Sequence, residues 1–523
     1  MSSDTESTHS GLQHFLILLC VSIPSFMINL DSNIVAVSLP SIAQSLGASF
    51  SDIEWVISAY TLVFASCVMP AGALADRYGR KRMLIIGLLT FTVASFLCGA
   101  ASSVAILNGS RALQGLGAAM LLSAALATLS HTFRGVQRAK AFAFWGSVIG
   151  IAISLGPVIG GFITQHFGWE WAFYINVPVG LLMVMLTWRS VEESRNPSAN
   201  KIDIPGALTF SGSLFLMTLG LIAANRDGWD SPKIMAELVS SVALFVLFIW
   251  LEKRQPHPML DMSFFRRPTY IGANIAGVSY AAGLLTMLTY LPVYFQSGLD
   301  FSPEMAGLLM LPIAVPLFLV PRIVSTQLTH RFSGRTLLTF GLSLTSAGLL
   351  WLGITAPQFN YHTMLFGLLL AGCGAGVLNG ETAKVSMSVI PPERAGMASG
   401  VSGTIRFSGL VLGFAALGAV LYQRIASVVD GGLPAHSAAE RTALSHEIAS
   451  GNLSAMVSSA PSIVDVHGLA MIGFGAGYQA VFLTGAFMIL IAAACTWWFV
   501  RSADTPPSPK HPALTDAVQV SQE

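Results

Sequence analysis

Charged residues are scarce in this sequence. Asp, Glu, Lys and Arg together make up 10% of its 523 residues, and the formal net charge is +1, whereas soluble domains carry roughly 25% charged residues. So few charges cannot cover the water-facing surface of a chain this long. A net charge near zero also lacks the basic excess that nucleic-acid-binding proteins use, so we expect no nucleic-acid partner.

Cysteine is also sparse, and its pattern excludes two kinds of site. The five cysteines are odd in number, form no C-x-x-C pair and fall inside apolar runs, so we expect neither a disulfide framework nor a metal site. The histidines fall mostly in loops, without metal-ligand spacing. The sequence contains no G-x-x-x-x-G-K-[ST] phosphate loop, no long polar domain and no catalytic cluster. It therefore predicts neither an ATP-driven pump nor an enzyme, and no cofactor.

Long apolar runs stand in place of charge. Hydrophobic residues make up 53% of the chain, and a membrane-spanning helix needs about 20 consecutive apolar residues. We therefore predict an all-α integral membrane protein with fourteen transmembrane helices. They lie near residues 13–39, 53–75, 83–101, 104–131, 141–164, 172–188, 205–223, 234–251, 269–296, 304–328, 335–355, 361–389, 396–424 and 478–500. Because no Lys or Arg precedes the first run, we expect it to be a membrane helix and not a cleaved signal peptide.

The positions of Lys and Arg predict the orientation. Most of the 27 Lys and Arg residues fall in loops that the helix order places on one side of the membrane. The other side has only Arg226, Lys233, Arg424 and Arg441. Cytoplasmic loops carry the excess of Lys and Arg. We therefore expect a multi-pass protein of the cell (inner or plasma) membrane with both termini in the cytoplasm.

One short segment between the second and third runs is unusually polar. Residues 72–84 read GALADRYGRKRML; glycines at both ends permit a tight turn with positive φ, and Asp76 can cap or pair at a helix end. The segment resembles the G-x-L-a-D-r-x-G-r-k loop between helices 2 and 3 of major facilitator superfamily transporters. The matching residues are Gly72, Leu74, Asp76, Arg77, Gly79, Arg80 and Lys81. The resemblance implies a secondary transporter with this loop as a conformational signature.

The chain also contains an internal repeat. Residues 327–335, QLTHRFSGR, echo the signature loop with His330 in place of Asp76, and the G-x-G-A of residues 115–118 recurs at 372–375. Two parallel six-helix halves, with the substrate between them near the midplane, are typical of this superfamily. The expected domains are an N-terminal six-helix bundle at 1–195, two inserted linker helices at 196–260 and a C-terminal six-helix bundle at 261–523.

The fifth run combines glycines with a proline. Pro157 removes the hydrogen bond that its nitrogen would make to the carbonyl of Ile153, so we expect a kinked helix. Its segment 155–161, LGPVIGG, is similar to the G-P-x-x-G-G signature of antiporters, which are exporters. The residues concerned are Gly156, Pro157, Gly160 and Gly161. Residues 30–40, 111–117 and 169–180 also resemble motifs of the fourteen-helix drug:proton antiporter branch, which implies multidrug efflux.

Two acids lie deep inside the predicted helices. A charged group in the hydrocarbon costs at least ~2.5–3.5 kcal/mol, so it is a functional candidate by default. We expect Asp31 to carry the coupling proton; the alternative is a buried acceptor that locks helices together. Glu381 is the second candidate, unless it only neutralises Lys384 three residues on. Arg111 and Arg406 are either counter-charges or residues that extend to an interface.

Local signals predict several helix ends. Residues 51–54, SDIE, fit a capping box at the start of the second helix. The segment 425–477 is expected to form an external loop that contains a helix, opened by the SAAE capping box of residues 437–440 and ended by Gly451. A second short helix is expected at residues 462–471.

These observations predict proton-coupled export of small amphiphilic compounds or drugs by alternating access, with the proton gradient as energy source and no cofactor. The expected partners are a small-molecule substrate, protons and the lipid bilayer; an accessory export protein is left open. The alternatives are an exporter of one specific metabolite or an uptake permease of the same superfamily. Substrate identity and charge, proton stoichiometry and oligomeric state do not follow from the residues.

Overall fold

The computed structural model describes residues 11–133, 135–195, 203–255, 258, 260–390, 395–434, 436–451 and 466–507. Within these ranges every regular element is a helix, and fourteen helices are long and apolar enough to cross a membrane. The prediction of an all-α membrane protein with fourteen spans is therefore confirmed.

The N-terminal half is built from six spans, of which the last is broken into two helices. They are α1 (Gly11–Leu46), α2 (Phe50–Tyr78), α3 (Arg80–Gly99), α4 (Val104–Thr132), α5 (Gly135–Phe167), α6 (Trp171–Tyr174) and α7 (Asn176–Ser190). Two further spans, α8 (Ile204–Asp227) and α9 (Pro232–Glu252), follow. They pack on each other, and α8 also packs on α2 and α16.

The C-terminal half also has six spans, several of which are interrupted. Its elements are α10 (Pro268–Tyr280), α11 (Thr286–Val293), α12 (Pro303–Leu309), α13 (Leu311–Ile323), α14 (Gly334–Thr355), α15 (Tyr361–Met387), α16 (Ala395–Gly432), α17 (Ala438–Ser450) and α19 (Val466–Phe499). Single π-helical turns continue α10, α11 and α13. Prolines such as Pro292 and Pro316 lie inside these spans, where a missing N–H loosens the helical ladder.

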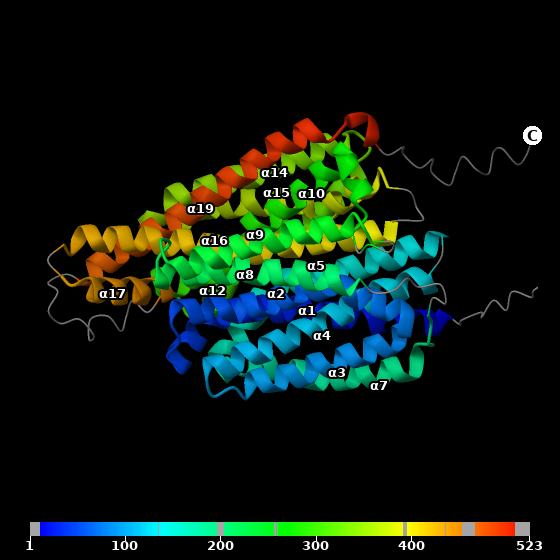
Figure 1. The fold of residues 1–523 in the computed structure, drawn as a ribbon, viewed down its shortest axis with the longest axis horizontal. Helices are drawn as coiled ribbons and strands as arrows, with labels where there is room; N and C mark the ends of the chain where they lie inside the picture. The colour runs from blue at the N-terminus through cyan, green and yellow to red at the C-terminus, as the bar shows by residue number, and fades with distance from the viewer. Residues whose placement is uncertain are drawn as a thin grey trace, which may run out of the picture.

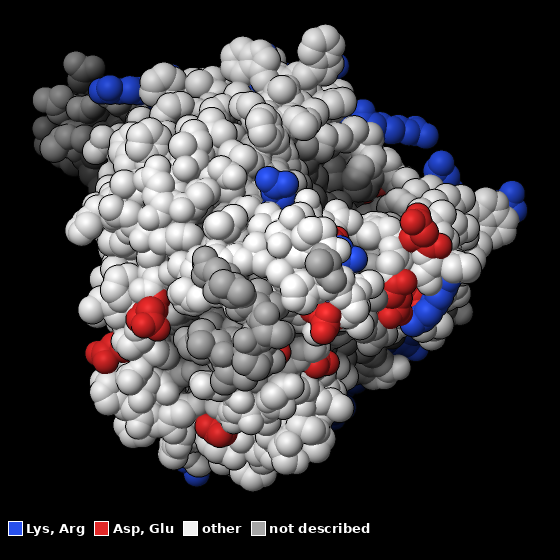
Figure 2. All heavy atoms as spheres, turned by 90° about the vertical axis from the view of Figure 1, so that its left-hand side faces the viewer, with Lys and Arg blue, Asp and Glu red and all other residues white. Residues whose placement is uncertain are grey.

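The two halves lie side by side with their helices roughly parallel (Figure 1). Helices α3, α4 and α7 form the outer part of one half, and α14, α15 and α19 that of the other. The helix α17 lies at one end of the bundle, here called the α17 end, while α1 begins and α19 ends at the opposite end. Figure 2 looks onto the α17 end, which is mostly uncharged, with acidic side chains scattered among the white atoms.

Close helix contacts between the halves occur toward the α17 end. A Cβ atom added to Gly161 of α5 would collide with the carbonyl oxygen of Pro303, and one added to Gly307 of α12 would collide with that of Pro157. Such backbone approach through small residues is how helices pack in lipid. In contrast, Gly146, nearer the start of α5, has no other atom within 4 Å of an added Cβ. Contact along α5 is therefore tight toward the α17 end.

The last two spans are longer than the sequence predicted. Helix α16 continues to Gly432, and α19 begins at Val466. The prediction of a short helix at 462–471 was wrong, because residues from 466 onward belong to α19 and residues 462–465 lie outside the described ranges. The helix opened by Ser437 is confirmed: its hydroxyl and Glu440 form a capping box, and Gly451 ends it with φ 81°.

Two corrections concern α2 and its ends. Its capping box uses Ser49 and Asp52, so the predicted box at residues 51–54 was two residues too late and Glu54 has no capping role. The turn after α2 rests on Gly79, with φ 120°, whereas Gly72 lies inside the helix. The polar segment is therefore a tight turn with glycine at one end only.

A third correction concerns α15. The sequence predicted one unbroken helix at 361–389, but Asn379 (ψ 110°) and Gly380 (φ 92°) leave the helical region directly before Glu381. Gly380 supplies a φ that other residues adopt at a cost. The break therefore separates Glu381 from the longer first part of α15.

Candidate functional site

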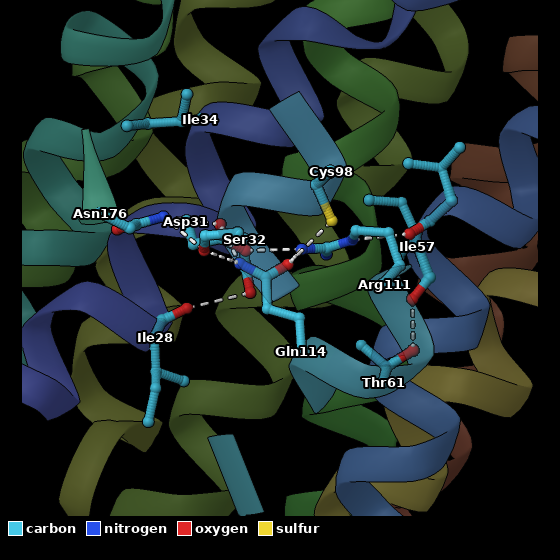
Figure 3. Close-up of polar contacts among 12 residues, drawn as sticks. Ile28, Asp31, Ser32, Ile34, Ile57, Thr61, Cys98, Arg111, Gln114 and Asn176 are labelled. Carbon is cyan, nitrogen blue, oxygen red and sulfur yellow. Dashed lines mark hydrogen bonds and ion pairs between the residues drawn. The ribbon is translucent and has the colours of Figure 1, made fainter. Parts of the chain in front are cut away.

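Asp31 lies at the centre of a buried polar network in the N-terminal half (Figure 3). Its side chain is fully buried in the middle of α1. Arg111 Nη1 of α4 donates to Oδ2 over 2.6 Å, while Gln114 Nε2 of α4 and Asn176 Nδ2 of α7 donate to Oδ1 over 2.8 and 3.0 Å. A carboxylate with a cation and two amide donors has its charge compensated without water.

Arg111 connects this carboxylate to a further helix. Its Nε donates to the carbonyl oxygen of Val56 in α2 over 3.0 Å, and its guanidinium lies 4.2 Å from the ring centroid of Tyr60, also in α2. Gln114 additionally donates to Ser95 Oγ of α3 over 2.7 Å. The network thus joins five helices, α1, α2, α3, α4 and α7, through one carboxylate and one guanidinium.

The structure places two predicted residues together and adds two more. Arg111 was predicted either as a counter-charge or as a residue that extends to an interface; in the structure it is the counter-charge of Asp31. Gln114 and Asn176 lie within the segments 111–117 and 169–180, which resemble family motifs, but the sequence did not identify them as site residues. The available signal was their type, because amides in the middle of apolar runs need buried hydrogen-bond partners.

The geometry makes the charge state of Asp31 a structural variable. In a buried ion pair, loss of one charge leaves the other uncompensated, which costs about 3–5 kcal/mol. A proton on Asp31 would leave the Arg111 charge in that position while its Nε remains bonded to Val56 of α2. Loss of either charge would therefore weaken the contact between α1 and α4.

Helix α5 links this network to the other half. Added Cβ atoms on Gly156 and Gly160 would come within van der Waals overlap of Asn33 and Ile34, two and three residues beyond Asp31 in α1. On its other side α5 contacts Pro303 of α12 through Gly161. The predicted antiporter segment therefore provides contacts of α5 both with the Asp31 helix and with the C-terminal half.

Comparison with known proteins identifies the family. The Major Facilitator Superfamily profile matches residues 21–414. The chain belongs to the Major Facilitator Superfamily. As a superfamily member it is a multi-pass membrane transporter and not an enzyme.

Relatives of this facilitator include several resistance proteins. It is 35% identical over 419 residues to the multidrug resistance protein Stp of Mycobacterium tuberculosis, covering 79% of this chain and 77% of that protein. It is 31% identical over 439 residues to the tetracenomycin C resistance and export protein of Streptomyces glaucescens, covering 82% and 81%. The multidrug efflux pump LfrA of Mycolicibacterium smegmatis is 29% identical over 492 residues, covering 93% and 96%.

Solved structures share the fold. The crystal structure of a bacterial homologue to the human lysosomal transporter Spinster, inward-facing and unoccupied, matches with a TM-score of 0.65 and 16% identity, covering 96% of this facilitator and 100% of that chain. At this identity the likeness concerns the fold alone.

The signature loop of this facilitator is held by charges on both sides of its turn. Asp76 Oδ1 accepts from Arg80 Nη2 over 2.8 Å and from its Nε over 3.1 Å. Glu193, beyond α7, accepts from the backbone N–H of Lys81 over 3.2 Å at the start of α3, where a negative charge is favourable. Arg77 lies over the ring of Tyr78, 5.6 Å from its centroid.

The second copy of the loop keeps the backbone arrangement, with a histidine in place of the acid. Ser194 accepts from Arg80 N over 2.9 Å after the last span of the first half, and Thr505 accepts from Gly334 N over 3.0 Å after the last span of the second. His330 occupies the place of Asp76. The repeat seen in the sequence therefore has a counterpart in how each half caps its third span.

Glu381 lies apart from the Asp31 network. It is nearly buried, its Oε1 lies 3.5 Å from Nζ of the half-exposed Lys384, and its Oε2 has no partner among the described residues. The cleft beside it is lined by residues of the C-terminal half, including Thr329 and Asp504. The structure does not bring Asp31 and Glu381 together.

Arg406 is also separate from the ion pair. Its guanidinium lies 5.3 Å from the ring centroid of Phe407 in its own helix α16. Phe407 in turn meets Phe64 of α2 edge-on, with centroids 4.4 Å apart. Arg406 is therefore near the contact between the halves, whereas Arg111 is the residue that neutralises Asp31.

Proposed function

We propose that this facilitator exports small amphiphilic compounds in exchange for protons, with Asp31 as the coupling residue. The observation that carries the proposal is the buried Asp31–Arg111 pair, which ties five helices to one titratable carboxyl. The relatives, which include a multidrug efflux pump and a resistance and export protein, support both the export direction and a drug-like substrate.

The cycle proceeds by alternating access between the two halves. With Asp31 ionised, its ion pair with Arg111 holds α1 and α2 against α4. A proton arriving at Asp31 removes the attraction, and the shift of α1 is passed through Gly156 and Gly160 to α5. Because α5 also contacts α12 through Gly161, the shift changes the packing of the halves and exchanges the side on which the substrate site is open.

The proton gradient supplies the energy, and the chain needs no cofactor. A proton that moves through ~100 mV releases ~2.3 kcal/mol, and each pH unit adds ~1.4 kcal/mol. Proposed partners are the substrate, protons and bilayer lipid. We also propose the division into residues 1–195, 196–260 and 261–523, with Asp76 and Arg80 as a switching contact and Glu381 and Lys384 as a local pair.

A transport assay tests this function. The purified protein is placed in proteoliposomes whose interior corresponds to the outside of the cell, and a fluorescent amphiphilic dye is added. When the vesicle interior is acidic, the protein should accumulate the dye inside the vesicles against the dye gradient. An uncoupler should abolish the movement. Dye transport that an uncoupler leaves unchanged would contradict proton coupling. Movement of the dye in the same direction as the protons would instead favour the uptake permease.

A transporter for one metabolite is the second candidate function. The riboflavin transporter RibZ of Clostridioides difficile is 29% identical over 404 residues, covering 77% of this chain and 87% of that protein. Competition among structurally unrelated compounds distinguishes the two cases. Mutual inhibition by several dyes supports a multidrug exporter, and inhibition by one compound class alone supports the specific exporter.

The orientation is part of the proposal and has its own test. We propose that both termini are cytoplasmic and that the α17 end faces outward in the cell membrane. A cysteine introduced at Glu447 of α17, in a background without the native cysteines, should react with a membrane-impermeant maleimide in intact cells. Labelling only after lysis would reverse the orientation.

A further inference from the structure

Helix α2 buries a second carboxyl group, which the proposed mechanism does not use. Glu54 is 1% exposed, and neither of its carboxylate oxygens has a hydrogen-bond partner among the described residues. Asp52, two residues earlier, completes the capping box with Ser49, so Glu54 does not serve the helix start. A buried acid without a partner is rare, since protein interiors pair such groups.

The carboxyl of Glu54 lies where the two halves meet at the α17 end. The cavity beside it is lined by residues of both halves. They are Leu39, Pro40 and Ile53 from the first half and Thr289, Tyr290, Val293, Phe414, Leu421, Ala449, Ser450 and Tyr478 from the second. A methyl group on Gly418 of α16 would overlap Glu54 Oε1. The carboxyl therefore packs directly against the opposite half, without room there for a hydrated cation.

The groups around Glu54 offer it little compensation. Tyr290 donates its hydroxyl to the carbonyl oxygen of Phe414 over 3.0 Å, and the hydroxyl of Tyr478 has no partner among the described residues. An ionised carboxylate buried without a donor or a cation costs several kcal/mol, whereas a neutral carboxyl group costs far less. In this closed arrangement the neutral form of Glu54 fits the site and the ionised form does not.

We propose that Glu54 is a second proton-binding residue, protonated while the halves are closed at the α17 end and able to ionise only when they part. Opening admits water to the carboxyl group of Glu54, which can then release its proton. Before the halves close again, Glu54 must take up a proton from the same side. Glu54 therefore makes closure depend on the acidity at the α17 end without adding to the protons carried across. In proton-coupled export, on which this proposal rests, an acidic exterior then favours the return of the empty transporter.

Other titratable groups near α2 must be considered as alternative sources of a pH dependence. The guanidinium of Arg111 in α4 faces Asp31, and the phenols of Tyr290 and Tyr478 titrate near pH 10 when unperturbed. Helix α17 packs on α2 and carries His446, whose ring centroid lies 4.6 Å from that of Tyr422. Because histidine titrates at physiological pH, His446 is the group that the experiment must separate from Glu54.

The test measures closure at the α17 end directly. A cysteine replaces Thr289, which lines the cavity beside Glu54, in a protein whose five native cysteines are changed to serine or alanine. The purified full chain in nanodiscs is labelled with a bulky hydrophilic maleimide, and rates are corrected with a cysteine at the exposed Thr442 of α17. One proton changes an equilibrium by at most tenfold per pH unit, which limits the change from about pH 8 to about pH 6 to about a hundredfold, and we expect the corrected rate to fall at least about tenfold over this range.

Variants assign that change to Glu54. Glu54→Gln, which mimics the neutral form, should label slowly at both pH values, and Glu54→Ala should also lose the pH dependence. His446→Gln should keep the wild-type change, as should Asp300→Asn, an exposed control whose φ of 57° suits Asn. A wild-type rate that ignores pH, a tenfold change retained in Glu54→Gln or Glu54→Ala, or its loss in His446→Gln would overturn the proposal.

Failure of the proposed function gives a different result. Labelling in nanodiscs needs no gradient, substrate or known orientation, so transport that an uncoupler leaves unchanged would contradict proton-coupled export while the labelling result for Glu54 stands. Conversely, a normal proton requirement for export together with a pH-independent labelling rate overturns only the role of Glu54.

Discussion

The N-terminal half buries two carboxyl groups, Asp31 and Glu54, in opposite environments. Asp31 receives hydrogen bonds from Arg111, Gln114 and Asn176, whereas Glu54 has no partner among the described residues and packs against the other half. Both are at most 1% exposed. Equal burial therefore goes with very different surroundings, because the neighbouring helices provide donors to one carboxyl group and none to the other among the described residues.

The largest effect should come from breaking the Asp31 network. Asp31→Asn keeps the size of the side chain but leaves the buried Arg111 charge without a partner, at a cost of about 3–5 kcal/mol in stability. Export should lose its response to a pH gradient entirely. Dye transport in proteoliposomes with imposed gradients measures the coupling, and thermal unfolding measures the cost.

A double variant separates charge from coupling. Asp31→Asn with Arg111→Gln removes both charges, so it should regain a large part of the lost stability but none of the coupling. Proton release on substrate addition provides a second measure. Release from Asp31→Asn equal to that of the wild type would exclude Asp31 as the coupling residue.

Arg111→Lys should have the second largest effect, because lysine keeps the charge but not the two-sided geometry. The wild-type guanidinium reaches both Asp31 and the carbonyl oxygen of Val56, and a single ammonium cannot reproduce that fork. Loss of one charge-assisted hydrogen bond is worth about 1.5–3 kcal/mol, so export should fall at least tenfold with normal membrane insertion. Wild-type export by Arg111→Lys would show that Arg111 acts only as a counter-charge.

Substitutions in the signature loop should reduce export less, and the loss should differ between the two halves. Asp76→Asn removes the charge that Arg80 binds across the turn, so export should decrease severalfold while expression stays normal. His330→Ala, the matched change in the second copy, should have little effect. Equal losses in the two variants would contradict a special role for the Asp76–Arg80 pair.

The Glu381–Lys384 pair should contribute less still. Its atoms are 3.5 Å apart, and although Glu381 is buried the Lys384 side chain is 51% exposed, so solvent screens the attraction and the pair should contribute about 0–1 kcal/mol. In a double-mutant cycle, Glu381→Gln with Lys384→Gln should restore what either single change impairs. A loss of export that persists in the double variant would give Glu381 a function of its own in proton binding.

Glu440 is an exposed acid, in contrast to the two buried ones, and its substitution should have the smallest effect. Hydrogen bonds from the backbone and hydroxyl of Ser437 lower the pKa of its carboxyl. Because the folded pKa lies below the unfolded one, the contribution to α17 is present above the unfolded value and is lost as the pH falls through the folded value. The protection of α17 amides against hydrogen exchange, corrected for the intrinsic exchange rate at each pH, should therefore fall on acidification in the wild type, but not in Glu440→Gln. Export at neutral pH should not change in that variant.

Local sequence determined much of this protein. Apolar runs of sufficient length dictate membrane helices because lipid cannot satisfy exposed backbone groups, so the number of spans followed from counting. Ser437, Glu440 and Gly451 define the ends of α17 because capping acts over one helical turn. Asp31 and Arg111 stood out for a similar reason, since charge inside an apolar run has a cost that must be balanced somewhere.

Only the tertiary structure decided which charges meet. Arg111 lies eighty residues from Asp31 along the chain, and nothing local distinguishes it from Arg406, which lies elsewhere. Asp52 and Glu54 are equally plausible caps by spacing, yet the start of α2 at Phe50 assigns the cap to Asp52 and turns Glu54 toward the other half. Hydrogen-bond donors and steric neighbours from distant helices set the role of a buried acid, and those depend on how the helices pack.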